Sequence, residues 1–282
     1  MADSRCTLAV PVTIKGIGLH SGERTSVCLM PAPPGQGIVF SRVDLPGKPA
    51  IRASTEVVTE SDRRTAIGAG DTAVGTVEHL LAALYAFGVD DLTIEVDGPE
   101  PPIGDGSASI YFEALECAEI REHECRREII RIGAPQTVVE GDARYDVTPL
   151  DGLRVSITIE WDHPNIGRQS GCYDITRETF GESLARARTF GFKDEVYELH
   201  ARGLAKGASE STVIVLTEAG IIGPSLRWPD EFVRHKTVDL LGDLALLGVR
   251  IEGEIVAFRP NHKGNIALAR FIERTASMDV LQ

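Results

Sequence analysis

Two histidines and one aspartate in this chain have the types and the spacing of a metal site. His235 and Asp239 are four residues apart within an apolar stretch, residues 231–247, that predicts a helix. On an α-helix this spacing places both side chains on one face, about one turn apart. His79 lies in a second helical stretch, directly after Glu78. Two imidazoles and one carboxylate form a ligand set for a tetrahedral Zn²⁺ whose fourth position is left for water.

Glu78 is the candidate base of this site. Side chains one residue apart on a helix diverge by about 100°, so Glu78 is expected beside the metal that His79 binds, where it can take a proton from water. A polar pair spaced four apart is also common on solvated helix faces, where it binds nothing. The apolar sequence around both histidines favours the metal site, because an unpaired imidazole is costly to bury. Together these residues predict a hydrolase with one Zn²⁺ per chain.

A second aspartate and a third histidine could together supply a general acid. Asp243 continues the row of His235 and Asp239 by one more turn, and His262 follows a predicted strand that could return it to the end of this helix. A carboxylate that accepts from one ring nitrogen favours the protonated imidazole and orients it. The pair would then act as an acid opposite Glu78. In the alternative interpretation, His262 has no catalytic role and is a loop histidine at the start of a helix.

Three further side chains could contact a substrate. Thr189 follows a predicted helix and could donate to an oxyanion, although a capped turn with a buried Phe explains the same segment. Lys236 projects about 100° from His235 on the helix, within reach of a phosphate or an oxyanion. Trp161 ends a predicted strand and could stack on a flat ring, although core packing is the more usual role of such a residue.

The elements that must position these residues follow the same order in both halves of the chain: strands, then helix, strand, helix. The second half adds an insertion, with a helix at 193–201 and a strand at 213–216, before its main helix. Runs of strands followed by helices favour an α+β fold with helices packed on mainly antiparallel sheets. Helices are predicted at residues 76–87 (with Thr76 as N-cap), 107–119, 177–187, 231–247 and 264–274, and strands at 10–14, 26–30, 91–97, 128–132, 137–140, 145–148, 153–161 and 251–258.

A charged run at residues 121–127 predicts a solvated linker between the halves. It divides the chain into two similar domains, residues 1–125 with the Glu-His motif and residues 126–282 with the insertion and the His-x3-Asp helix. Since each domain supplies part of the ligand set, the metal is expected where the two domains meet.

Composition limits the classes of function. An apolar content of 43% with 25% charged residues is typical of a globular protein, and no stretch approaches the ~18–20 apolar residues of a membrane span. A net charge of −13 argues against general binding of nucleic acid. The five cysteines are scattered and form no CxxC, so we expect neither a disulfide framework nor a cysteine zinc site, and a reducing, cytoplasmic compartment.

Five stretches of this chain, in order and spanning nearly all of it, resemble the UDP-3-O-acyl-N-acetylglucosamine deacetylase family of lipid A synthesis. The resemblance implies a two-domain α+β sandwich with helices between outer sheets, and Zn²⁺ as cofactor. The matching stretches are Gly16-Ile-Gly-Leu-His-Ser-Gly22, Thr76-Val-Glu-His79, Pro102-Ile-Gly-Asp-Gly-Ser107, Ala187-Arg-Thr-Phe-Gly-Phe192 and Glu231-Phe-Val-Arg-His-Lys236 with Asp239 and Gly242-Asp243.

The resemblance also implies a role for each matching residue. His79, His235 and Asp239 correspond to the zinc ligands and Glu78 to the general base. His262 corresponds to the general acid or an electrostatic partner, and Asp243 to the carboxylate that orients it. Thr189 corresponds to the group beside the oxyanion.

For the substrate, the resemblance implies that Lys236 contacts a phosphate or hydroxyl, Phe190 packs on the sugar and Trp161 lies under the uracil. Four residues of the insertion would line a passage for the fatty acyl chain: Val196, Ala205, Val213 and Val215.

The leading hypothesis is hydrolysis of the N-acetyl group of an acylated UDP-glucosamine to the free amine and acetate, the committed step of lipid A synthesis. One alternative is a zinc amidase that acts on a different amide. Another is a non-catalytic module that binds nucleotide sugars or lipids, which the presence of both Glu78 and His262 disfavours.

Overall fold

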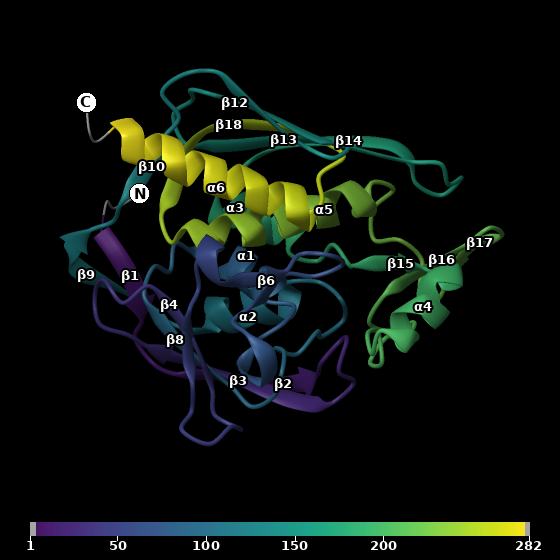
Figure 1. Ribbon diagram of the computed structural model, residues 1–282, viewed down its shortest axis with the longest axis horizontal. Coiled ribbons are helices and arrows are strands. Elements are labelled where there is room, and N and C mark those ends of the chain that lie inside the picture. The colour runs from purple at the N-terminus through teal and green to yellow at the C-terminus, as the bar shows by residue number, and fades with distance from the viewer. Residues whose placement is uncertain (1–3, 280–282) are drawn as a thin grey trace.

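The computed structural model describes residues 4–279 and is organised around one buried helix, α1 (Glu78–Phe87). Alanines, leucines and aromatic residues occupy all sides of this helix, and each of its ten residues is buried. A helix that is apolar all round must be covered on every side. Figure 1 shows how the fold achieves this: α1 lies in a layer of helices between two outer sheets.

The first outer sheet has five strands, in the spatial order β2-β3-β8-β4-β5. Its central strand is antiparallel to β3 and parallel to β4. Alternate residues of β8, namely Leu92, Ile94 and Val96, are buried under the helices, as the period of two requires of a sheet covered on one face. The strands are β2 (Val12–Ile17), β3 (Arg24–Pro31), β4 (Ile38–Arg42), β5 (Ala50–Arg52) and β8 (Leu92–Val96).

The second outer sheet repeats this arrangement strand for strand. Its order is β11-β12-β18-β13-β14, and its central strand is again antiparallel to one neighbour, β12, and parallel to the other, β13. A short strand, β10, adds beside β18. The strands are β10 (Ile129–Arg131), β11 (Gln136–Glu140), β12 (Ala143–Thr148), β13 (Leu153–Trp161), β14 (Gly167–Asp174) and β18 (Arg250–Phe258).

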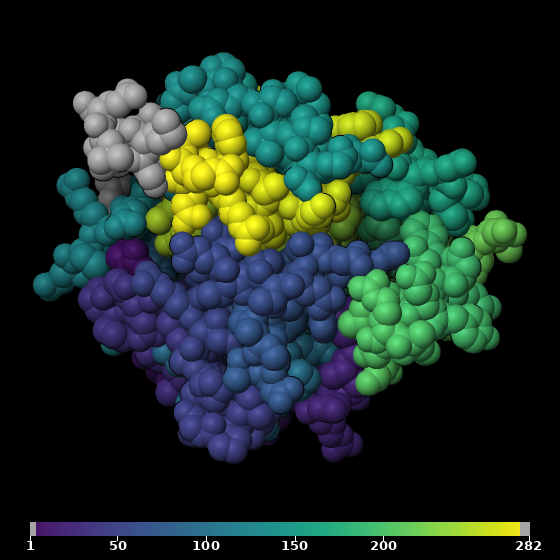
Figure 2. Space-filling model, in the orientation of Figure 1, coloured from purple at the N-terminus to yellow at the C-terminus, as the bar shows by residue number. Residues whose placement is uncertain are grey.

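Each central strand is flanked in the sequence by the two helices that cover its sheet. In the sequence, β8 lies between helices α1 and α2 (Ser109–Cys117). In the same way, β18 lies between α5 (Glu231–Leu244) and α6 (His262–Asp279). In Figure 2 the yellow α6 is visible between the teal second sheet and the blue first half. The predicted α+β fold, with two similar halves and helices between outer sheets, is confirmed.

The insertion lies outside the two sheets and the helix layer between them. It packs against the first half of the chain, at the right of Figures 1 and 2. The Ala205 N–H donates to His20 Nδ1 (3.2 Å), and the Gly207 N–H donates to the Leu19 carbonyl (2.9 Å). The insertion follows a short helical segment, α3 (Arg177–Thr179), which continues as a π-helical turn at Phe180–Leu184. It contains β15 (Phe190–Phe192), α4 (Val196–Ala201), β16 (Ile214–Thr217) and β17 (Gly220–Ile222).

The prediction of a solvated linker is wrong. Residues 121–127 belong largely to strand β9 (Ile120–Arg126), which pairs antiparallel with β1 (Ser4–Leu8). Its inward positions, including His123 and Cys125, are half-buried while the charges between them face solvent, so a charged run with a period of two forms a strand. The division into residues 1–125 and 126–282 stays a prediction, with its boundary inside this strand.

The prediction that Thr76 caps the N-terminus of the first helix is also wrong. Helix α1 begins at Glu78, and Thr76 adopts a left-handed backbone (φ 53°) with its hydroxyl donating to Glu100 Oε2 at 2.8 Å. The remaining short elements are β6 (Val58–Glu60), β7 (Ala66–Ile67) and 3₁₀ turns at Thr55–Val57, Gly70–Thr72, Lys193–Glu195 and Ala245–Leu247. Within residues 4–279, no helix combines the length and apolar character needed to cross a membrane.

Candidate functional site

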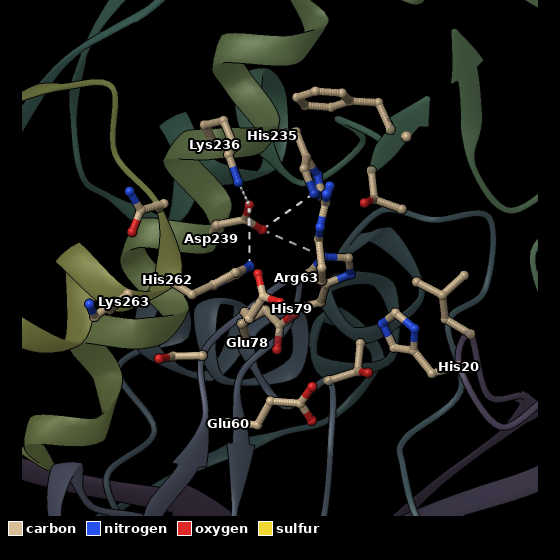
Figure 3. A pocket seen from close by; sticks show the side chains of 18 of the residues that line it. His20, Glu60, Arg63, Glu78, His79, His235, Lys236, Asp239, His262 and Lys263 are labelled. Atoms are coloured by element: carbon tan, nitrogen blue, oxygen red, sulfur yellow. Dashed lines mark hydrogen bonds and ion pairs between the residues drawn. The ribbon is translucent and has the colours of Figure 1, made fainter. Parts of the chain in front are cut away.

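The two helices that face each other across the middle layer bring the predicted metal ligands together. His79 comes from α1, and His235 and Asp239 come from α5. One potential ligand atom of each lies within 4.8 Å of the other two. Asp239 Oδ1 is 3.3 Å from His235 Nε2 and 3.7 Å from His79 Nε2. All three side chains are at least 95% buried, and Figure 3 shows them converging at the floor of a cavity.

The protonation of this group suits a divalent cation. Burial, and then His235, lowers the pKa of His79 to about 3, and burial likewise lowers the pKa of His235. Burial alone would raise the pKa of Asp239, but His235, Lys236, His262 and His79 together hold it below its ordinary range. Two neutral imidazoles and a carboxylate are the forms that bind Zn²⁺.

The second nitrogen of each imidazole has a different environment. His235 Nδ1 is 3.0 Å from the carbonyl oxygen of Ala187, which leaves Nε2 facing Asp239. An imidazole held in this way by a carbonyl presents a fixed nitrogen to a metal. His79 Nδ1 is buried and has no hydrogen-bond partner among residues 4–279.

Asp239 uses its two oxygens for different neighbours. Oδ1 faces both imidazoles, whereas Oδ2 accepts from Lys236 Nζ at 2.7 Å and lies 3.9 Å from His262 Nε2. Lys236 thus lines the cavity with its ammonium group next to the ligand group. A substrate anion that binds Lys236 would compete with this contact.

Glu78 lies at the same floor and is 3% exposed. The backbone N–H of Thr65 donates to its Oε2 at 3.1 Å, which fixes the carboxyl group. Burial, opposed by His262 and assisted by Asp243 and Asp239, raises the pKa of Glu78 to about 7. A carboxylate with such a pKa can exchange a proton near neutral pH.

His262 is the first residue of α6, and its Nδ1 lies 2.8 Å from Asp243 Oδ2. Asp243 also accepts from the Thr65 hydroxyl (2.5 Å) and from Asn265 Nδ2 (2.9 Å). Burial opposes the charged imidazolium, but Asp243 and Asp239 outweigh it and raise the pKa of His262 to about 9. The ring is therefore an imidazolium at neutral pH, with Nε2 turned toward Asp239.

The cavity above this floor has a volume of about 780 Å³. Thr189, Phe190 and Trp161 line one wall. Trp161 is half-buried at the end of β13, and its ring meets that of Phe190 edge to face at a centroid distance of 5.6 Å. Phe190 in turn contacts Phe232 of α5. Phe190, the predicted sugar contact, therefore packs against α5, the helix that carries His235 and Asp239, and Trp161, the predicted uracil contact, packs against Phe190.

The structure does not bring the predicted acyl-passage residues into this cavity. Ala205 is buried against the first half of the chain, and Val196, Val213 and Val215 are half-buried elsewhere in the insertion. The residues of the insertion that do line the cavity are Phe190, Gly191, Phe192 and Glu195. Glu195 forms a bidentate ion pair with Arg63 of the first half (2.9 and 2.8 Å), and both residues line the cavity.

Sequence reasoning missed two residues that do not line the cavity but hold Glu78 and Asp243 in place. Thr65 touches both Glu78 and Asp243, and no local pattern distinguishes it. Asn265 lies three residues after His262 on α6, so the spacing of one helical turn could have identified it. Tyr145 of the second sheet donates to Asn265 Oδ1 at 2.7 Å and orients its amide toward Asp243.

Comparison with known proteins gives a consistent result across nearly the whole chain. The family model described as "LpxC: UDP-3-O-acyl N-acetylglycosamine deacetylase" matches residues 5–274. A protein of Myxococcus xanthus named UDP-3-O-acyl-N-acetylglucosamine deacetylase is 43% identical over 265 residues, which cover 94% of this chain and 84% of that protein. Proteins with the same name from Bdellovibrio bacteriovorus (42% identical, 91% and 85% covered) and Nitratidesulfovibrio vulgaris (40% identical, 98% and 89% covered) are also similar.

Proposed function

This chain belongs to the UDP-3-O-acyl-N-acetylglucosamine deacetylase family, and on that premise we propose that it hydrolyses the N-acetyl group of UDP-3-O-acyl-N-acetylglucosamine to acetate and the free amine. One observation carries the proposal. A buried group of three potential metal ligands lies at the floor of a cavity of about 780 Å³, beside a carboxyl group and an imidazolium suited to opposite proton transfers.

We assign His79, His235 and Asp239 as the ligands of one Zn²⁺. Their buried positions, the neutral imidazoles and the carbonyl that orients His235 support this assignment. When bound there, Zn²⁺ would act as a Lewis acid toward water and toward the amide carbonyl.

In the proposed mechanism Glu78 is the general base. Its carboxylate, held by the Thr65 N–H, accepts a proton from the water that attacks the acetamide carbonyl. The raised pKa of Glu78 makes it a stronger base than an ordinary carboxylate while leaving it partly ionised at neutral pH. The Thr189 hydroxyl, on the wall above, donates to the oxygen that becomes negative during attack.

His262 completes the reaction as the general acid. Its imidazolium is kept protonated by Asp243, so it can deliver a proton to the amine nitrogen as the carbon–nitrogen bond breaks. Asp243 holds Nδ1 and leaves Nε2 as the atom that donates. The net change is one amide and one water converted to acetate and an amine.

The upper cavity accommodates the nucleotide sugar in this proposal. Lys236 contacts a phosphate or hydroxyl, Phe190 packs on the sugar and Trp161 stacks on the uracil. For the acyl chain we keep the insertion as the proposed passage, through Val196, Ala205, Val213 and Val215. We further propose that the reaction is the committed step of lipid A synthesis and occurs in the cytoplasm, in keeping with five unpaired cysteines.

Acetate release from the zinc-loaded protein tests the function. Incubation with UDP-3-O-acyl-N-acetylglucosamine should yield acetate and a free amine in equal amounts, and a chelator should abolish both. Binding of the substrate by a zinc-loaded, folded protein without any turnover would contradict the proposal in favour of a non-catalytic binding module. Faster release from an unrelated N-acetyl compound would indicate an amidase of different specificity.

A further inference from the structure

Glu231 and Arg188 form an ion pair that is almost completely removed from solvent. Arg188 Nε and Nη2 donate to the two carboxylate oxygens at 2.8 and 3.0 Å, and the Arg188 backbone N–H donates to Oε1 at 3.1 Å. The backbone N–H of Arg227 donates to Oε2 at 2.6 Å. The side chains of Arg188 and Glu231 are 7% and 0% exposed. This carboxylate therefore holds both the side chain and the main chain of Arg188.

The main chain that Glu231 holds lies between two groups of the active site. Residue 187 supplies the carbonyl that faces His235 Nδ1, and residue 189 is the proposed oxyanion donor. The Thr189 N–H donates to the Gly106 carbonyl at 2.7 Å. Glu231 itself lies on α5 one turn before His235. Three consecutive residues are thus each held by a different group. Ala187 contacts the assigned metal ligand His235, Arg188 binds Glu231, and Thr189 binds Gly106 in the loop before α2.

A second ion pair closes this set of contacts into a ring. Arg227 donates through Nη2 to Asp105 Oδ2 at 2.5 Å, and Asp105 directly precedes Gly106, which binds Thr189. The loop also lies directly against the insertion, because a Cβ on Gly106 would overlap the Thr212 carbonyl. The ring therefore joins the first half of the chain to α5 and encloses the backbone of Thr189.

A buried ion pair is weak evidence for stability, because desolvation of the two charges offsets their attraction. Rigid placement of reacting groups, in contrast, is worth a large factor in rate, since small displacements are costly. We propose that Glu231 and Arg188 are positioning residues that set the His235 imidazole and the Thr189 hydroxyl relative to each other. This inference rests on the proposed function of the same site.

Two single substitutions test the pair. Glu231→Gln keeps the size and removes the charge, and Arg188→Lys keeps the charge and removes the planar fork. Removal of a residue that orients a metal ligand typically costs ~10–100-fold in metal affinity or activity. We expect kcat per folded protein and the affinity for Zn²⁺, measured by competition with a chelator, to fall by about that factor, with KM little changed. Folded variants that keep both values within twofold would overturn the inference.

The buried pair Arg5–Asp91 provides the matched control. It is also bidentate (2.7 and 2.9 Å) and 11% and 0% exposed, but neither residue lines the cavity. Asp91→Asn should lower the melting temperature and leave kcat and zinc affinity unchanged. A fall in kcat with Asp91→Asn equal to that with Glu231→Gln would overturn the inference, because the effect would then follow from destabilisation alone.

A double variant separates positioning from the cost of a lone buried charge. In Glu231→Gln with Arg188→Gln no unpaired charge remains, so part of the stability should return, whereas kcat and zinc affinity should stay low because the fork is absent. Recovery of both values together with stability would contradict positioning. If the unaltered protein binds zinc but releases no acetate, the proposed function fails, and the zinc affinities of these variants still decide the role of the pair.

Discussion

A side chain at Gly242 would overlap the backbone carbonyl of Glu78, so helices α5 and α1 contact each other backbone to backbone. This close approach accompanies the convergence of His79 of α1 with His235 and Asp239 of α5, whose ligand atoms lie within 4.8 Å of one another. We predict that Gly242→Ala, which must push the helices apart, lowers the melting temperature and weakens Zn²⁺ binding at the same time. Overpacking of this kind typically costs ~1–3 kcal/mol. Calorimetry and zinc titration measure the two effects.

Gly133 is the control for this substitution. A Cβ there meets no atom within 4 Å, and its backbone is not left-handed. Gly133→Ala should leave both the melting temperature and zinc binding unchanged. Unaltered zinc binding in Gly242→Ala would show that the helix contact does not set the ligand geometry.

The three assigned ligands should each be required for zinc. Substitution of His79, His235 or Asp239 by Ala removes one of three protein ligands, and we predict that each variant loses its zinc during dialysis. His163, which binds the Thr217 carbonyl and does not line the cavity, gives a control, His163→Ala, that should keep its zinc. Unchanged zinc content in all three variants, measured by atomic absorption, would disprove the site.

Glu78→Gln should separate catalysis from metal binding. The substitution keeps the shape of the side chain and removes its basicity, so zinc content and KM should persist. A positioned base contributes about 10²–10⁴-fold, and kcat should fall by that order. Loss of zinc would instead make Glu78 a ligand, and normal turnover would place the base elsewhere.

Trp161→Ala should raise KM with little change in kcat, because removal of an interaction that is equally strong in the ground state and the transition state has this effect. Trp161 is half-buried, lines the cavity and also packs on the core. A control, Val139→Ala, changes a strongly exposed residue outside the cavity and should affect neither value. A large drop in melting temperature with unchanged KM would assign Trp161 to the core.

The contribution of Glu231 to stability should depend on pH. Burial alone would raise its pKa, but hydrogen bonds from Arg188 and the Arg227 backbone hold it below the ordinary value. A carboxyl group whose pKa falls on folding stabilises the fold above its unfolded pKa, about 4.3 for Glu, and the contribution is lost as pH falls below that value. The destabilisation by Glu231→Gln, from urea unfolding, should therefore be full near neutral pH and shrink in acid. A penalty independent of pH would contradict this, as would an equal trend in Glu124→Gln, an exposed control.

The local parts of the site could be predicted from sequence because they depend on helix geometry alone. The spacing of His235, Asp239 and Asp243 determines that they share one face of α5, and the apolar residues around His79 determine that its helix is buried. The order of strands and helices likewise determined the duplicated α+β fold, since each half must cover one face of its own sheet.

Contacts between distant segments were decided only by the tertiary structure. Thr65 joins Glu78 to Asp243, and strand β9 replaces the expected linker, because both depend on which backbone lies alongside. Which residues of the insertion line the cavity, Phe192 and Glu195 among them, also follows from tertiary packing, while the acyl passage stays a proposal. Periodicity in a sequence reports which face of an element is buried, whereas the partner on that face follows from packing of the whole chain, to which Gly242 contributes by the absence of a side chain.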